Sequence, residues 1–153
     1  MSIENYSFIV RDVTRLPQAV AEHQDALIRN HVLLIEAPMG AGKTTFVSAL
    51  ATLMGSLITP SSPTFSICNE YELFNPISGY VQIVHMDLYR LKSTEEILNS
   101  GIDDYIYDPT SLVIVEWPEL IIPMIVGEYT YMTIDIGDDH FRKYSYSYRS
   151  ESG

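Results

Sequence analysis

With 153 residues, 46% of them hydrophobic and 19% charged, the chain has the length and composition of one globular domain. Twenty Asp and Glu residues against nine Lys and Arg give a formal charge of −11, which repels a phosphate backbone and favours a basic protein over nucleic acid as the partner. Because we find no signal peptide, no apolar run near the roughly 18 residues that span a bilayer, and only one cysteine, we expect a single cytoplasmic domain over residues 1–153, without a disulfide or a membrane contact.

The first two expected elements are a helix and a strand. Thr14, followed by the run LPQAVAEHQDALIRN, predicts a helix capped by Thr14, with one face formed by Leu16, Val20, His23 and Leu27. The next run, HVLLIE at 31–36, is continuously apolar until its last residue, which is typical of a strand covered on both faces.

A glycine-rich loop, APMGAGKTT, follows this strand, and FVSALATLMG then predicts a helix ending near Gly55. The loop departs from the phosphate-binding pattern G-x-x-x-x-G-K-[ST] at one position, where Ala37 replaces the first glycine. Gly40 and Gly42 allow consecutive N–H groups to turn toward an anion, and the positive end of the following helix adds to this attraction. We therefore predict a P-loop, against the alternative of a turn that binds nothing, with nucleotide contacts from Met39, Gly40, Ala41, Gly42, Lys43, Thr44 and Thr45.

The segment TPSSPTFSICNEYE, residues 59–72, allows two interpretations. Pro60 and Pro63 restrict its start to extended or turn conformations. Thr64 is placed to turn its hydroxyl toward a nucleotide as a switch residue. A loop that leads into a strand from Thr64 to Tyr71 describes the backbone equally well.

Two later runs predict buried strands that end in acids. YVQIVHMD at 80–87 ends in Asp87, and SLVIVE at 111–116 ends in Glu116. Ligands of open α/β sheets bind outside the carboxyl ends of the strands, which is also where a P-loop begins. Both acids are therefore expected near the bound phosphates, unless each is merely a solvated residue that closes its strand. Between the two strands, the spacing of Ser93 and Glu96 predicts a capping box for a short helix.

The C-terminal segment predicts a hairpin of two strands, EYTYMTIDI and FRKYSYSYR. Three tyrosines, Tyr144, Tyr146 and Tyr148, alternate with serines and are expected on one face. They indicate either packing under the sheet or an aromatic surface for a partner.

Together, the motifs of this chain resemble those of the TsaE family, small bacterial P-loop ATPases needed for the threonylcarbamoyl modification of adenosine in transfer RNA. The resemblance extends over about residues 31–120 and is carried by GAGKTTF at 40–46, SPTF at 62–65, NEY at 69–71, HMDLYRL at 85–91 and EWPE at 116–119. Residues and resemblance together predict a single-domain α/β P-loop NTPase. Its central sheet is expected to be largely parallel and flanked by helices, with antiparallel strands added near residues 64–86 or at the C-terminus.

The resemblance implies roles for individual residues. Lys43, Thr44 and Thr45 are expected to contact phosphates and metal, Asp87 to associate with Mg²⁺, and Glu116 to be needed for hydrolysis. The expected catalytic residues are thus Glu116, Asp87 and Lys43, and the expected metal ligands are Thr44, Asp87 and Glu116. Thr64 resembles the family's switch threonine, and Trp117 resembles its tryptophan beside the nucleotide, although a core indole fits the sequence equally well.

The resemblance leaves other positions without a clear role. His85, Tyr89 and Arg90 belong to the family signature; Arg90 is either a cation for transition-state charge or the partner of an acid. Ala37 and Pro38 depart from the family, which usually has Gly and Asp there.

The function that the resemblance implies is Mg²⁺-dependent ATP hydrolysis on the complex of TsaB with TsaD, the protein that transfers the threonylcarbamoyl group. ATP and Mg²⁺ are the expected cofactors, and tRNA is reached only through the complex. A nucleotide-gated binding module with negligible hydrolysis is the main alternative. A small-molecule kinase is disfavoured because the sequence has no lid-like cluster of basic residues.

Overall fold

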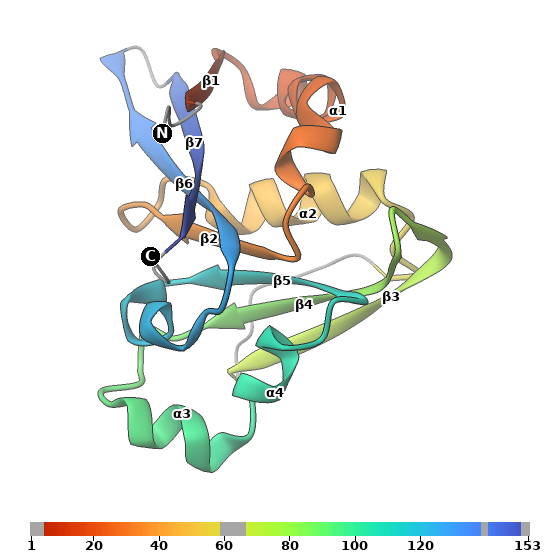
Figure 1. The fold of residues 1–153 in the computed structure, drawn as a ribbon. Helices are drawn as coiled ribbons and strands as arrows, with labels where there is room; N and C mark the ends of the chain where they lie inside the picture. The colour runs from red at the N-terminus through yellow and green to blue at the C-terminus, as the bar shows by residue number, and fades with distance from the viewer. Residues whose placement is uncertain (1–4, 59–66, 139–140, 151–153) are drawn as a thin grey trace.

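The computed structural model describes residues 5–58, 67–138 and 141–150, which form an α/β fold around a mixed sheet of seven strands (Figure 1). The strands are β1 (Asn5–Val10), β2 (Val32–Glu36), β3 (Cys68–Ile77), β4 (Tyr80–Asp87), β5 (Ser111–Glu116), β6 (Glu128–Ile136) and β7 (Arg142–Ser150). The helices are α1 (Leu16–Leu27), α2 (Lys43–Leu53), α3 (Thr94–Ser100) and α4 (Asp103–Ile106), with 3-10 turns η1 (Val13–Arg15), η2 (Pro118–Leu120) and η3 (Ile122–Met124).

The sheet has the strand order β1-β7-β6-β2-β5-β4-β3. Its four central strands, β6, β2, β5 and β4, pair in parallel, whereas β3 joins β4 and β7 joins β6 in antiparallel pairs. β1 pairs with β7, also antiparallel. The predicted α/β fold is confirmed, and antiparallel strands occur at both of the places where the sequence allowed them.

Helices cover both faces of the central strands, which explains why β2 and β5 are continuous apolar runs (Figure 1). On one face, α1 and α2 pack on a cluster that contains Leu33, Ile35, Phe46 and Ile114. On the other face, α3, α4, η2 and η3 enclose a second cluster that contains Leu34, Val84, Val113, Ile97 and Ile121. In the described part of the chain, no helix is long and apolar enough to cross a membrane.

The cap predicted for α1 is wrong. Thr14 lies inside η1, and the residue before α1 is Arg15, whose side chain makes no capping hydrogen bond. Asp12 caps the segment instead, because its carboxylate accepts a hydrogen bond from the Thr14 N–H at 3.0 Å. Asp is as good a capping residue as Thr, so the earlier Asp starts the helical segment.

The region between α2 and α3 follows the sequence prediction in part. β3 begins at Cys68 and continues to Ile77, so it extends six residues past the predicted end at Tyr71; its proposed start at Thr64 lies outside the described residues. α3 begins as predicted, with the Ser93 Oγ accepting the Glu96 N–H at 3.2 Å. The return bond of the capping box differs, because Glu96 accepts from the Lys92 N–H at 3.4 Å.

The tyrosines of β7 pack beneath the sheet, which confirms the first of the two interpretations. Tyr144 and Tyr146 are buried, and their rings stack on Phe8 and Tyr6 of β1 with centroids 4.8 and 5.0 Å apart. The Tyr148 hydroxyl donates a hydrogen bond to the Ala26 carbonyl of α1 at 2.7 Å. This aromatic layer therefore fixes α1 over β1 and β7.

Candidate functional site

The glycine-rich loop connects the end of β2 directly to the first turn of α2. Gly40 and Gly42 have φ angles of 78° and 96°, in the left-handed region that residues with a Cβ rarely adopt. Ala37 is different: among the described non-glycine residues only Ser78 and Trp117 have a positive φ. The first position of the loop therefore does not need a glycine in this backbone, so the replacement by Ala37 leaves the path of the loop intact.

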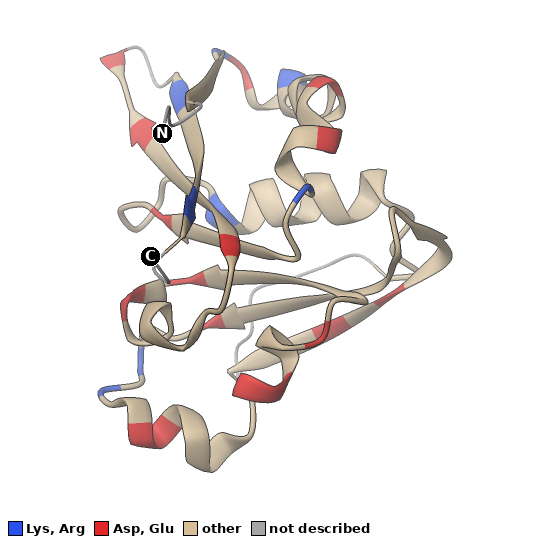
Figure 2. Ribbon diagram, in the orientation of Figure 1, with Lys and Arg blue, Asp and Glu red and all other residues tan. Residues whose placement is uncertain are grey.

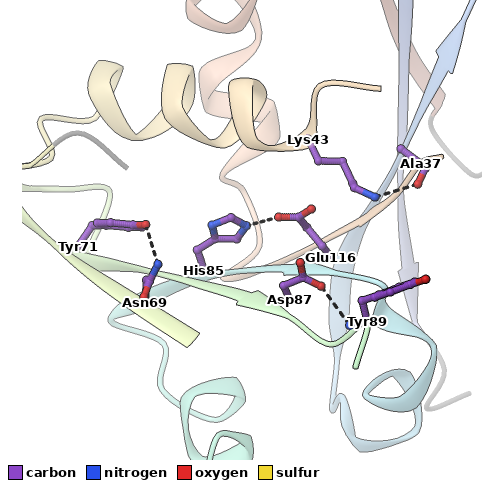
Figure 3. Close-up of polar contacts among 8 residues, drawn as sticks. All are labelled: Ala37, Lys43, Asn69, Tyr71, His85, Asp87, Tyr89 and Glu116. Atoms are coloured by element: carbon purple, nitrogen blue, oxygen red, sulfur yellow. Dashed lines mark hydrogen bonds and ion pairs between the residues drawn. The ribbon is translucent and has the colours of Figure 1, made fainter. Parts of the chain in front are cut away.

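Lys43, the first residue of α2, is buried beneath this loop. Its Nζ donates a hydrogen bond to the Ala37 carbonyl at 3.0 Å and lies 4.3 Å from the centroid of the Trp117 ring (Figure 3). An ammonium has three N–H donors, and the other two make no hydrogen bond within the described chain. Two N–H donors of the lysine can therefore bind an anion at the loop.

The two predicted acids lie side by side at the carboxyl ends of adjacent strands. Asp87 of β4 and Glu116 of β5 are Cα partners, and Ile35 near the end of β2 is the partner of Glu116 on the other side. Because these strands are parallel, both acids emerge at the edge of the sheet where the glycine-rich loop begins (Figure 3). Asp87 is partly exposed and accepts the Tyr89 N–H at 3.0 Å. Glu116 is only 3% exposed.

His85 provides a hydrogen-bond partner for the buried Glu116 carboxylate. The two side chains lie on the same face of the sheet, and His85 Nε2 is bonded to Glu116 Oε2 (Figure 3). His85 is fully buried, and its Nδ1 has no hydrogen-bond partner among residues 5–58, 67–138 and 141–150.

Trp117 lies directly after the catalytic candidate Glu116 in an unusual backbone conformation. Its φ of 55° is left-handed, which costs of order 1–3 kcal/mol for a residue with a side chain and is often found at functional sites. The Tyr89 ring packs against it with centroids 5.0 Å apart. Trp117 is therefore in contact with Lys43 on one side and with Tyr89 on the other, and it is not enclosed in the core.

The remaining predicted site residues are distributed around the loop. Thr44 and Thr45 occupy the first turn of α2, with Thr44 partly buried and Thr45 exposed, and Met39 projects into solvent with 64% of its surface exposed. Ala41 closes a tight turn by donating its N–H to the Pro38 carbonyl at 3.2 Å.

Thr64 is not among the described residues. Arg90 is exposed and forms no ion pair with any acid that the structure describes.

Arg142, at the start of β7, contacts the loop, and no local sequence pattern indicated this contact. Its Nε donates a hydrogen bond to the Ala41 carbonyl at 3.2 Å. Beside this bond is a cavity of about 240 Å³ lined by Val10, Arg11, Val13, Leu16, Gly40, Ala41, Gly42, Thr45, Arg142 and Tyr144. The walls of the cavity thus come from the loop and from β1, η1 and β7, which are distant from the loop in the sequence.

Among the residues that the structure describes, the carboxyl ends of these strands offer oxygen ligands for a divalent cation, but too few to complete its coordination shell with protein atoms alone. No group of three or more His, Cys, Asp or Glu side chains that could hold a metal occurs among residues 5–58, 67–138 and 141–150. The oxygen-bearing side chains near the loop include the carboxylates of Asp87 and Glu116 at the strand ends and the Thr44 hydroxyl in the first turn of α2. This donor set suits Mg²⁺, which usually binds one or two carboxylates and completes its shell with phosphate oxygens and water.

Known proteins match this chain along most of its length. The model of the family "Threonylcarbamoyl adenosine biosynthesis protein TsaE" matches residues 10–144. A protein of Bacillus subtilis is 34% identical over 116 residues, which are 76% of this chain and 68% of the relative. A protein of Nostoc is 32% identical over 122 residues, or 78% of this chain and 71% of the relative.

One further relative and one solved structure are also similar. A protein of Borreliella burgdorferi is 34% identical over 95 residues, covering 61% of this chain and 64% of the relative. All three relatives carry the name tRNA threonylcarbamoyladenosine biosynthesis protein TsaE. The crystal structure of YdiB from Bacillus subtilis superposes with a TM-score of 0.68 over 96% of this chain and 87% of the other, and at 24% identity it shows that the fold is the same.

Proposed function

This chain belongs to the TsaE family of threonylcarbamoyl adenosine biosynthesis proteins, and we propose that it is the Mg²⁺-dependent ATPase subunit that supports tRNA threonylcarbamoyladenosine synthesis by the TsaB–TsaD complex. The observation that carries the ATPase proposal is the position of one cation and two acids. Lys43 lies below a loop of left-handed glycines, and Asp87 and Glu116 end the neighbouring strands at the same edge of the sheet.

Each of these groups has a task in phosphoryl transfer. The N–H groups of the loop and the positive end of α2 attract the phosphates, and the Lys43 ammonium exchanges its Ala37 carbonyl for phosphate oxygens. Thr44, Asp87 and Glu116 are the residues that would hold Mg²⁺, which, when bound, neutralises charge on the transferred phosphate. Glu116 is also positioned to orient the attacking water, because its strand ends beside the loop.

The nucleoside part of ATP has room on the other side of the loop. The cavity of about 240 Å³ begins at Gly40 and Gly42 and is bounded by apolar side chains, together with Arg11 and Arg142. Apolar walls with a few polar groups are typical of small-molecule sites. We therefore place the base and ribose in this cavity, with the phosphates extending over the loop toward Glu116.

The acidic surface supports docking on a protein rather than on tRNA. Besides the formal charge of −11, four acids lie in the first turns of α3 and α4: Glu95, Glu96, Asp103 and Asp104 (Figure 2). A phosphate backbone is repelled by such a surface, whereas a basic protein face is attracted to it. In our proposal TsaB and TsaD are the direct partners, and tRNA is reached only through them.

One observation favours the second candidate, a nucleotide-gated module with little hydrolysis. One oxygen of the Glu116 carboxylate is already bonded to His85, and the group is almost completely buried. A carboxylate held in this way orients water only if its other oxygen faces the phosphates. Slow hydrolysis by the isolated chain is therefore compatible with the geometry, and stimulation by the partners would distinguish an ATPase from a gated module.

The test is the rate of phosphate release from Mg·ATP by the purified chain, alone and with TsaB and TsaD. Glu116→Gln removes the carboxylate at constant size, and Glu72→Gln, at an exposed acid on β3, is the matched control for the loss of one negative charge. ATP binding is measured in parallel by calorimetry for all three proteins.

The ATPase proposal predicts faster release with the partners, a loss of about 10²-fold or more in kcat for Glu116→Gln, and little change for Glu72→Gln. Equal binding of ATP by wild type and Glu116→Gln would show that the loss is in the chemical step. ATP binding without any release, with or without the partners, would refute hydrolysis and leave the gated module.

A further inference from the structure

His85 is a fully buried polar side chain in the candidate site to which the proposed chemistry assigns no task. It lies on β4 two residues before Asp87, on the face that α2 covers (Figure 3), and within the described part of the chain its hydrogen bond is to Glu116 on β5. Its Nδ1 is buried, and no residue that the structure describes forms a hydrogen bond with it. A buried polar atom without a partner lowers stability, so packing alone does not favour histidine at this position.

The unpaired Nδ1 indicates which nitrogen carries the hydrogen. If Nε2 carries it, the ring donates to the Glu116 carboxylate, and Nδ1 is an acceptor without a donor. If Nδ1 carries it, a buried N–H is left without an acceptor, and such orphan donors are rare in folded proteins. The hydrogen-bond network therefore assigns the Nε2–H form, in which His85 donates to Glu116 Oε2.

This bond leaves one carboxylate oxygen available. Glu116 Oε1 accepts no hydrogen bond from the described chain, whereas Oε2 is held by His85. The histidine thereby fixes the rotation of the carboxylate about its last bond, in the same way that a ring N–H bonded to a carboxylate orients both groups at metal and catalytic sites. With Oε2 occupied, Oε1 is the oxygen that can act on water or metal.

We propose that His85 is a positioning residue, which holds the Glu116 carboxylate so that Oε1 points to the reacting phosphate and Oε2 does not. The proposal rests on the proposed ATPase function, because Glu116 needs an orientation only if it acts in hydrolysis. It assigns to the histidine of the HMDLYRL motif a role in the rate of the chemical step and none in the affinity for nucleotide.

Three variants test the proposal. His85→Leu removes the donor and keeps an apolar side chain of similar size. His85→Gln keeps an N–H donor that can reach Glu116. His31→Gln is the matched control, because His31 also makes one hydrogen bond, to the Ile106 carbonyl at 2.6 Å, but lies at the amino end of β2, away from the loop.

Three measurements are made on the full chain: urea unfolding, ATP binding by calorimetry, and phosphate release in the presence of TsaB and TsaD. We expect kcat to fall about 10- to 100-fold in His85→Leu, which is the usual effect of removing a supporting carboxylate–histidine bond. The Kd for Mg·ATP should change by less than about twofold, and His85→Gln should recover most of the lost rate. His31→Gln should lose stability only.

Two results would overturn the positioning role while the ATPase proposal stands: a normal kcat in folded His85→Leu, or equal losses in His85→Leu and His85→Gln. If His85→Leu does not fold, His85→Gln and an NMR measurement on ¹⁵N-histidine-labelled wild type decide the question. The proposal requires the Nε2–H form and a change in that signal in Glu116→Gln; an Nδ1–H form would refute it. If the wild type releases no phosphate with its partners, the ATPase proposal itself fails, and the positioning role fails with it.

Discussion

Replacing Gly42 by alanine separates two properties of the glycine-rich loop, its conformation and its proposed contact with ATP. Gly42 has φ 96° and ψ 28°, and a Cβ added there meets no atom within 4 Å in the described residues, its two chain neighbours aside. The added methyl therefore costs only backbone strain, about 1–2 kcal/mol for a left-handed residue. Gly55, after α2, is a matched control, because its φ of 90° is nearly the same and its surroundings are also open.

Both variants are expected to lose about 1–2 kcal/mol of unfolding free energy, which lowers Tm by roughly 2–8 °C in a chain of this size. Only Gly42→Ala should weaken ATP binding. If the strained peptide relaxes, its N–H turns away from the phosphates, and one hydrogen bond to a charged group is worth about 1.5–3 kcal/mol. This corresponds to an increase in Kd of roughly 10- to 150-fold.

Calorimetric titration of Mg·ATP into wild type, Gly42→Ala and Gly55→Ala measures the affinities, and thermal unfolding without nucleotide measures the stabilities. An unchanged affinity in Gly42→Ala, with the expected loss of stability, would refute the role of this loop in binding phosphate. Equal loss of affinity in both variants would mean that general destabilisation, not the loop, controls binding.

Two other substitutions test local features of the structure. Ala37→Gly restores the glycine of the P-loop pattern. Because Ala37 is buried and has an ordinary φ, the variant loses the burial of a methyl group and gains entropy in the unfolded chain. We expect it to lose about 1–2 kcal/mol of unfolding free energy and to keep the same affinity for ATP. Tighter ATP binding in calorimetry would contradict the interpretation of Ala37. Tyr80 is buried, which raises the pKa of its phenol from 10.0 to about 12, so the stability it provides is complete below pH 10 and is lost as the pH rises from 10 toward 12. Tyr80→Phe loses the hydrogen bond to the Ile28 carbonyl and should be less stable than wild type at pH 7 by about 1 kcal/mol. In urea unfolding, the variant should lose less stability than wild type between pH 8 and 11. Parallel curves of stability against pH would contradict the prediction.

Local sequence patterns predicted the central part of this fold well. The strands β2, β4 and β5 are apolar runs because both faces of the sheet are covered, and this burial leaves a signal in a few consecutive residues. The loop and the start of α2 are also local, since the glycines that need a positive φ and the lysine follow each other directly. Two strand-end acids, Asp87 and Glu116, were placed together by a general rule for parallel sheets.

The contacts that sequence did not reveal join residues distant in the chain. The bonds from His85 to Glu116 and from Arg142 to Ala41 depend on the pairing and register of strands, which no local pattern encodes. The pairing of β1 with β7 is of the same kind. The error at Thr14 had a different cause, because two good capping residues stand close together and Asp12 took the position.

The place of β7 in the sheet has a consequence for the order in which the protein forms during translation. β7 lies between β6 and β1, and its first residue, Arg142, also bonds the loop at Ala41. A nascent chain therefore leaves the ribosome with β1 unpaired, because β7, the strand that β1 joins in the described part of the chain, is made more than a hundred residues later. The central strands can associate earlier, but the glycine-rich loop gains the hydrogen bond from Arg142 only when the hairpin of β6 and β7 has emerged and paired with β1.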